Sequence, residues 1–270
     1  AIVHEYGRDE LLRRLAHPFW FQSFGAVMGM DWHSSGITTS VIGALKRGLT
    51  PLAGELGIHV CGGRGRHSRR TPEELALVGE RVGLDGAALA RASRLVAKVD
   101  SAAVQDGFEL YLHGFIVSDD GRWVVVQQGM NGARGQARRY HWSSEDLTSF
   151  VDSPHAAIEG PGVGRIVNLA DRRAAASRKA QLELLRDLGA ADIAREFARI
   201  DGRAEAPPLA AARAGEPFQL GLLPHLAMPD HHDVRGVDVV TRRLHGALAA
   251  AAECDPRDFT ELLQCPGVGP

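Results

Sequence analysis

Carboxylate and imidazole side chains occur in parts of the chain that are otherwise rich in glycine and aromatic residues. Asp31 and His33 lie in the stretch FWFQSFGAVMGMDWHSSG, and His113 lies in the apolar run FELYLHGFIV. Both kinds of group ligate metal ions, and imidazole also moves protons near neutral pH. Burying such a group without a partner costs roughly 1–3 kcal/mol. We therefore expect the three side chains to share one cleft and to hold a cation such as Mg²⁺ or Mn²⁺. The alternative is that each satisfies its own structural neighbours.

Two predicted strands carry a second set of polar residues. Asp106 precedes the first strand, and Gln127 and Gln128 lie on the second. Metal-dependent nucleases often combine an acidic residue before one strand with an Asp, Glu or Gln on the next, followed two residues later by lysine. Gly129 and Met130 stand where that lysine is expected, which weakens the nuclease interpretation. Otherwise the glutamines satisfy polar neighbours of an ordinary hairpin. The candidate catalytic residues are Asp31, His33, Asp106, His113 and Gln127.

A third polar cluster lies nearer the C-terminus, where His225 follows Pro224, and Asp230, His231 and His232 follow Pro229. Consecutive histidines can face one point on a loop but not on a regular helix or strand. This cluster either binds a metal ion or leaves its imidazoles in solvent, with Asp233 as a helix cap.

Two basic segments are candidates for binding nucleic acid. The first is a glycine-rich loop with Arg64, Arg66 and Arg69, and the second is ARGQARRYHW, with Arg138, Arg139 and Tyr140. Arginines interleaved with aromatic residues suit charge and stacking contacts to single-stranded or flipped nucleotides. Each segment could equally be a solvated run of charge. We expect Arg64, Arg66 and Arg139 to lie at the rim of the polar cleft.

The C-terminal residues FTELLQCPGVGP indicate the start of a helix-hairpin-helix. A helix with apolar Phe259, Leu262 and Leu263 is followed by Gly267, Val268 and Gly269. Backbone N–H groups in such a turn, at the start of a second helix, bind phosphate without reading sequence. A plain helix C-cap with a glycine turn is the alternative.

The strands and helices expected from the sequence determine where these candidate residues lie. The strongest pattern is a β-hairpin over 108–117 and 122–128 that turns at Asp119–Gly121. Residues 56–60 are expected to form a strand, and helical patterns cover 5–16, 36–49, 72–82, 85–99, 171–200, 234–251 and 255–264. Thr71 and Glu74 have the spacing of a capping box, and Asp255 precedes a proline as an expected N-cap. The fold class is therefore α+β, with an antiparallel hairpin sheet packed by helices and an all-helical C-terminal region. We place a mixed domain at 1–205 and a helical DNA-binding region at 218–270.

Composition limits the function classes. The net charge is −2, so the chain as a whole lacks the excess positive charge that is typical of nucleic-acid-binding proteins. The absence of a long apolar run argues against a membrane span. Three scattered cysteines exclude a disulfide framework and favour a reducing, cytoplasmic compartment. Because the chain starts at Ala1 and ends inside a motif, we expect further residues at both ends.

The chain also resembles a known family. The stretches HPFWFQSFGAVMGMDWHSSG, LGIHVCGGRGRHSRRTPEEL, QDGFELYLHGFIVSDDGRWVVVQQGMN and MPDHHDV, followed by LLQCPGVGP, are similar to the bacterial and archaeal domain-of-unknown-function family 763. The resemblance covers nearly the whole chain and implies no settled biochemical role. Function therefore has to come from the residues themselves.

DNA is the expected partner, in processing or repair. The first hypothesis is a metal-dependent nuclease that hydrolyses phosphodiesters. The second is a base-excision glycosylase of the helix-hairpin-helix type, and the third is a non-catalytic DNA-binding scaffold.

Overall fold

The computed structural model describes residues 1–162, 164, 166–200 and 241–268. These residues divide into two compact units, 1–175 and 176–268. The expected boundary between residues 205 and 218 lies outside the described residues.

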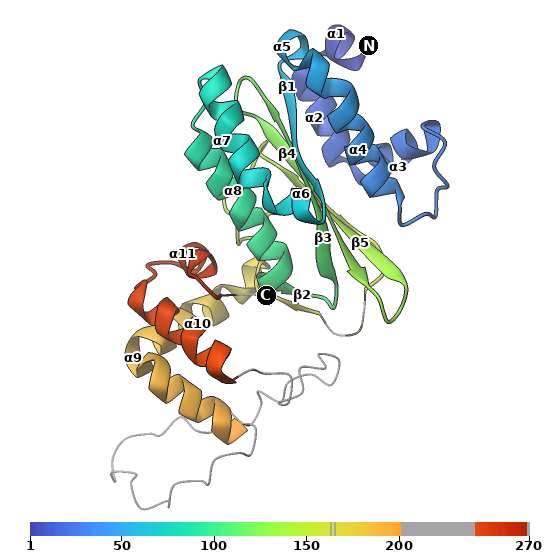
Figure 1. Cartoon of the computed structure of the whole chain (residues 1–270). Coiled ribbons are helices and arrows are strands. Elements are labelled where there is room, and N and C mark those ends of the chain that lie inside the picture. Colours follow the sequence, from blue (N-terminus) through green and yellow to red (C-terminus); the bar gives the residue numbers. More distant parts are fainter. Residues whose placement is uncertain (163, 165, 201–240, 269–270) are drawn as a thin grey trace, which may run out of the picture. The chain divides into compact units, whose positions relative to one another are not determined.

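The first unit is organised around a five-stranded antiparallel sheet in its described part, in the order β1-β3-β4-β5-β6 (Figure 1). The strands are β1 (Ile58–Arg64), β3 (Glu109–Ser118), β4 (Trp123–Asn131), β5 (Gln136–Ser143) and β6 (Ala157–Glu159). A separate short pair joins β2 (Val104–Gln105) to β7 (Val167–Asn168). The α+β class and the antiparallel sheet expected from the sequence are confirmed.

The predicted hairpin forms β3 and β4. Its turn passes through Asp119 and Asp120 to Gly121, whose φ of 82° is readily adopted by glycine. The Gly121 N–H donates to the Ser118 carbonyl at 2.9 Å. The register places His113 opposite Gln127, so their side chains share one face of the sheet.

One face of the sheet is covered by α1 (Ile2–Tyr6), α2 (Arg8–Ala16), α3 (Pro18–Val27) and α4 (Ile37–Leu49). Alternate strand residues Leu112, Ile116, Val124 and Val126 meet these helices in the main apolar core. The helices contribute the following buried residues to it: Leu11, Leu12, Leu15, Ala16, Phe21, Ile37, Val41, Ile42 and Leu45. The aromatic stretch near residue 20 is thus helical because it contributes to this core. A 3₁₀ turn, Thr50–Leu52, and α5 (Ala53–Leu56) lead into β1.

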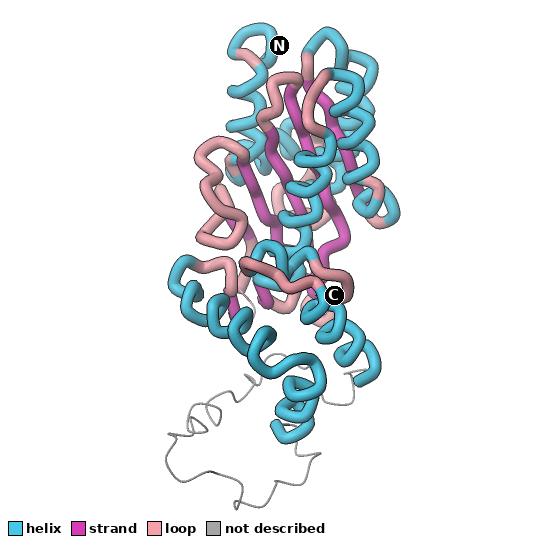
Figure 2. Tube along the Cα trace, turned by 90° about the vertical axis from the view of Figure 1, so that its left-hand side faces the viewer, coloured by secondary structure: helices cyan, strands magenta, loops and turns pink. Residues whose placement is uncertain are grey.

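The opposite face carries α7 (Thr71–Val82) and α8 (Gly86–Lys98), so helices flank the sheet on both sides (Figures 1 and 2). Asp85 caps α8 by accepting from the Ala88 N–H at 2.9 Å. The expected capping box at Thr71 is wrong, because Glu74 accepts instead from the Gly62 N–H and from Lys46 at 2.8 and 2.7 Å. Glu74 therefore ties α7 to β1 and α4. The short helix α6 (Arg66–Arg69) precedes α7.

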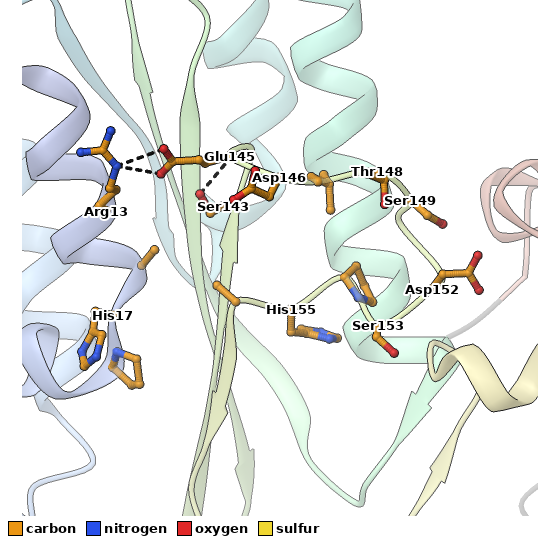
Figure 3. Close-up of a pocket in the computed structure, with 15 residues that line it drawn as sticks. Arg13, His17, Ser143, Glu145, Asp146, Thr148, Ser149, Asp152, Ser153 and His155 are labelled. Atoms are coloured by element: carbon orange, nitrogen blue, oxygen red, sulfur yellow. Dashed lines mark hydrogen bonds and ion pairs between the residues drawn. The ribbon is translucent and has the colours of Figure 1, made fainter.

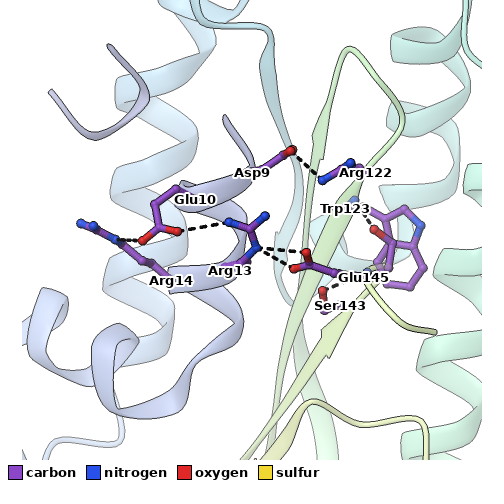
Figure 4. Close-up of polar contacts among 9 residues, drawn as sticks. Asp9, Glu10, Arg13, Arg14, Arg122, Trp123, Ser143 and Glu145 are labelled. Atoms are coloured by element: carbon purple, nitrogen blue, oxygen red, sulfur yellow. Dashed lines mark hydrogen bonds and ion pairs between the residues drawn. The ribbon is translucent and has the colours of Figure 1, made fainter. Parts of the chain in front are cut away.

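Ion pairs link α2 to the sheet (Figure 4). The Arg13 Nε donates to both oxygens of Glu145 at 3.0 and 2.9 Å, and Arg122 pairs with Asp9 at 2.6 Å. Glu10 bridges Arg13 to Arg14. Since these groups are exposed or half-buried at the surface, solvent and salt screen the pairs. Their role is to orient α2 rather than to dominate stability.

The regular elements of the second unit are all helices within its described residues. It contains α9 (Ala175–Ile200), which is interrupted at Gly189, α10 (Thr241–Glu253) and α11 (Phe259–Gln264). The expected cap at Asp255 is wrong: Asp258 caps α11 by accepting from the Glu261 N–H at 2.8 Å. No helix of the described chain has the length and apolar character needed to cross a membrane.

Candidate nucleic-acid interface

The sheet separates the three polar residues, Asp31, His33 and His113, that were expected to share one cleft. Asp31 and His33 are exposed in the loop between α3 and α4, whereas His113 is buried beneath α8 on the other face. The expectation of a shared cleft is therefore wrong, because successive strand residues point to opposite faces and the sheet lies between them. The described residues also contain no group of three or more His, Cys, Asp or Glu side chains that could hold a metal ion.

Asp31 and His33 interact locally instead. The Asp31 Oδ1 accepts a hydrogen bond from the His33 backbone N–H at 3.1 Å, which forms an Asx turn. Ser34 accepts from the Gly36 N–H at 3.1 Å just before α4 begins. These bonds shape the loop and leave the His33 ring at the edge of a pocket described below.

Both ring nitrogens of His113 form hydrogen bonds with buried protein side chains. Its Nδ1 lies 2.6 Å from the Gln127 Oε1, and its Nε2 lies 2.9 Å from the Ser93 hydroxyl. An amide oxygen only accepts, so Nδ1 carries the proton and Nε2 accepts from Ser93. Burial lowers the pKa of His113 and keeps the ring neutral.

Asp100 is the buried centre of this network, and sequence analysis missed it. It accepts from the Gln127 amide, from the Trp142 Nε1 at 2.8 Å and from the His155 Nε2 at 2.5 Å. The available signal was a carboxylate within the apolar run LVAKVDSAAV. Gln127 thus bridges His113 to Asp100, which matches the alternative that it satisfies polar neighbours.

Asp106 belongs to the same buried layer. It accepts from the Tyr140 hydroxyl at 2.6 Å and forms an ion pair with Arg138 at 3.2 Å. Burial raises the pKa of Asp106, while the Tyr140 hydrogen bond and the Arg138 charge oppose that rise. Tyr140 is fully buried and Arg138 is engaged with Asp106, so the expectation that these two contact DNA is corrected. Both residues lie on β5, whose successive side chains point to opposite faces of the sheet, and most of them are buried or half-buried.

Arg139 points to the α3–α4 face and is also buried. Its Nε donates to the His141 Nε2 at 2.8 Å, and its two terminal nitrogens donate to the Gln22 Oε1 at 2.7 Å and the Pro18 carbonyl at 3.2 Å. Burial lowers the pKa of Arg139 to about 10, so the guanidinium remains charged at neutral pH. Arg139 is therefore not a surface phosphate ligand, although it lines a pocket.

The exposed arginines gather where β1 ends. Arg64, Arg66 and Arg69 are all exposed, and none of them forms an ion pair with a carboxylate of the described chain. The Arg64 guanidinium lies 6.0 Å from the centre of the Tyr111 ring. Arg64 and Tyr111 line a hollow of about 720 Å³ beside the start of α4, together with Ser35, Gly36, Thr39 and Glu109. Exposed arginines without carboxylate partners beside this hollow suit phosphate contacts.

Another hollow, of about 420 Å³, lies between the end of α2 and the loop that follows β5 (Figure 3). His17 and His155 face it, and its charged lining includes Glu145, Asp146 and Asp152. Arg13 also lines it and pairs with Glu145, which leaves Asp146 and Asp152 as excess negative charge. This charge disfavours phosphate, so the hollow does not extend the arginine surface.

Comparison with known proteins identifies the chain at the level of a family. A family model described as Protein of unknown function (DUF763) matches residues 1–270. The chain belongs to this family. No curated protein and no solved structure matches it significantly.

The C-terminal turn of this DUF763 chain is described as far as Val268. Gly267 has a φ of 81°, and a Cβ there would lie 3.2 Å from that of Ala247 on α10. The Val268 N–H donates to the Cys265 carbonyl at 3.2 Å. Gly269 and the histidine cluster at 225–233 lie outside the described residues, so phosphate binding by the turn stays a prediction.

Proposed function

We propose that this chain is a DNA-binding protein that acts in DNA processing or repair, and that it holds the phosphate backbone through Arg64, Arg66 and Arg69. The observation that carries the proposal is the exposure of these three arginines without carboxylate partners in the described chain. Residues 62–70 include no acidic residue, so positive charge is concentrated there despite a net charge of −2.

The hollow lined by Arg64 and Tyr111 supports the same contact with the phosphate backbone. Arg64 and Tyr111 place a charge beside an aromatic ring, the combination that binds a flexible nucleic-acid backbone and its bases. The turn at Gly267 and Val268 would add a second phosphate contact if the helix-hairpin-helix forms.

The described residues favour binding over catalysis. Asp31 and His33 are separated from His113 by the sheet, and the described chain has no cluster of three metal-ligating groups. Nuclease and glycosylase activities are therefore outcomes to be tested rather than parts of the proposal.

The test measures DNA affinity by fluorescence anisotropy over a range of salt concentrations, with single- and double-stranded oligonucleotides of several sequences. We expect affinity that tolerates sequence changes and falls steeply with salt. The variant R64A/R66A/R69A should bind weakly to every sequence. Its slope of log affinity against log salt on duplex DNA should become shallower by roughly 0.9 for each phosphate that the variant no longer neutralises.

A matched control removes the same charge elsewhere. Arg81, Arg91 and Arg94 are exposed on α7 and α8 and form no ion pair within the described chain. R81A/R91A/R94A should retain most of the affinity. Equal losses in the two variants would contradict the proposed surface, and so would a wild-type chain that does not bind DNA. Incubation with Mg²⁺ or Mn²⁺ should leave the DNA intact, and cleavage would overturn the non-catalytic interpretation.

A further inference from the structure

A pocket on the α3–α4 face has features of a built ligand site. Its volume is about 370 Å³, within the range of ~300–1,000 Å³ typical of small-ligand pockets. The loop between α3 and α4 forms one wall, and the strands β4 and β5 form the floor. Gln128 and Arg139 line it from the strands, and Trp32 and His33 line it from the loop. Phe19 on α3 and Thr38 on α4 complete this part of the lining.

Two residues of the pocket lining each carry a buried polar atom without a hydrogen-bond partner among the described residues. Thr38 is 0% exposed and Gln128 is 3% exposed. The Thr38 Oγ1 and the Gln128 Oε1 form no hydrogen bond with any described residue. An unpaired buried polar atom costs roughly 1–3 kcal/mol, so two in one pocket call for a ligand that pairs with both.

The remaining hydrogen bonds fix the pocket in place. The Gln128 Nε2 donates to the Ser35 carbonyl at 3.0 Å, so its amide presents only an acceptor to a ligand. Gln22 accepts from Arg139 and donates to the Trp32 carbonyl, which fastens the loop to the floor. Arg139 uses three of its five N–H groups in these and neighbouring bonds, and the other two remain as donors.

The mouth of the pocket carries an aromatic pair. Phe19 is 64% exposed and Trp32 is 41% exposed, and their ring centroids lie 5.7 Å apart. Exposed rings beside buried hydrogen-bonding groups suit a flat heterocycle that stacks and pairs at its edge. The Glu159 carboxylate offsets the Arg139 charge in the same lining, so the pocket suits a neutral ligand.

We propose that this pocket binds one unpaired nucleobase that carries an amino group, taken from a single strand or extruded from a duplex. The amino group donates to the Gln128 Oε1, an adjacent ring nitrogen or carbonyl accepts from the Thr38 hydroxyl, and the base stacks against Trp32. Ser35 lines both this pocket and the Arg64 hollow, so a strand held by the arginines would pass the pocket. This inference deepens the proposed DNA binding and rests on it only for the strand, because a free nucleoside would use the same groups.

The test uses the full chain with two probes. The first is a set of free nucleosides measured by calorimetry, and the second is a single-stranded oligonucleotide with one 2-aminopurine among thymines. We expect millimolar to micromolar binding of adenosine or cytidine, and quenching of 2-aminopurine fluorescence as the base stacks on Trp32. T38V should lower nucleoside affinity by roughly three- to tenfold, the loss expected for one hydrogen bond.

T38V also separates a ligand role from a structural role. Because the Thr38 hydroxyl has no partner in the described chain, its removal should leave Tm unchanged or raise it. W32A should lower affinity roughly tenfold or more through the loss of stacking. T148V makes the same change at an exposed threonine of the hollow between α2 and the loop after β5, and it should alter neither property.

The two proposals fail in different ways. DNA binding that depends on Arg64, Arg66 and Arg69 but shows no 2-aminopurine quenching and no nucleoside binding would overturn the base pocket and leave the arginine surface intact. Nucleoside binding without DNA binding would overturn the surface and leave the pocket. Affinity equal in wild type and T38V, or a Tm lowered by T38V, would contradict the ligand role of Thr38.

Discussion

Gln127 and Gln128 are neighbours in the chain, yet they act on opposite faces of the sheet. The Gln127 amide accepts from His113 and donates to Asp100 beneath α8. The Gln128 amide donates to Ser35 on the α4 face and leaves its oxygen unpaired among the described residues. One is a satisfied structural bridge and the other lines a ligand pocket.

Replacing Gln127 with leucine should destabilise the chain strongly. The change removes the acceptor of the His113 Nδ1–H and one donor to Asp100, and each unsatisfied buried group costs roughly 1–3 kcal/mol. Urea denaturation should therefore show a loss of about 2–4 kcal/mol in the free energy of unfolding. Q128L removes one hydrogen bond and an atom already unpaired, so it should cost clearly less. Equal losses would show that the two glutamines are not differentiated in this way.

His141 should make stability depend on pH. Burial lowers its pKa to about 3, and the nearby Arg139 charge adds to that effect. Its Nε2 accepts from Arg139 and its Nδ1 donates to the Leu15 carbonyl, so the folded chain holds the ring neutral. The unfolded chain takes up a proton near pH 6.5, so the native state binds fewer protons below that pH. Stability is present above pH 6.5 and is lost as the pH falls, at up to about 1.4 kcal/mol per unit.

Denaturation midpoints between pH 7.5 and 5 would measure this slope. H141Q keeps a donor and an acceptor without titrating, so its profile should be flatter than that of wild type. His113 contributes in the same direction and leaves a residual slope. H4Q makes the same change at an exposed histidine and serves as the matched control. A wild-type slope retained by H141Q would remove His141 as its source.

Much of the sheet was predictable, because strand periodicity and an Asp-Gly turn are local signals. The hairpin follows from Asp120-Gly121 between two apolar runs. The grouping of polar residues was not predictable in the same way. Whether His113 meets Asp31 depends on which face each strand residue points to and which helix covers it. The roles of Asp100 and Thr38 were also not predictable, because the sequence around a buried polar residue does not show which side chains it will meet.

Gly62 is required where β1 meets α7. Its φ is 83°, and a Cβ there would lie 2.2 Å from the His113 backbone oxygen and 2.5 Å from the Thr71 hydroxyl. G62A should therefore lower the free energy of unfolding by at least about 1–3 kcal/mol through backbone strain alone. G48A is the control, because a Cβ at this helical position meets no described atom within 4 Å. Thermal unfolding should show G48A neutral or slightly more stable than wild type, and a harmless G62A would contradict the close approach.

The turn at Gly267 offers the sharpest remaining test of the C-terminal motif. Alanine at this position meets a positive φ and a contact of 3.2 Å with Ala247, so G267A should distort the turn after α11. If the turn binds phosphate, the variant should weaken DNA binding by a similar factor for every sequence, because the contact is made by backbone N–H groups. G246A on α10 is the matched control, since its Cβ meets no described atom within 4 Å. Anisotropy and circular dichroism on the same samples distinguish a loss of binding from a loss of helix. Full DNA affinity in G267A, with the helical signal unchanged, would assign this glycine to helix packing alone and leave the arginines at the end of β1 as the proposed DNA contact.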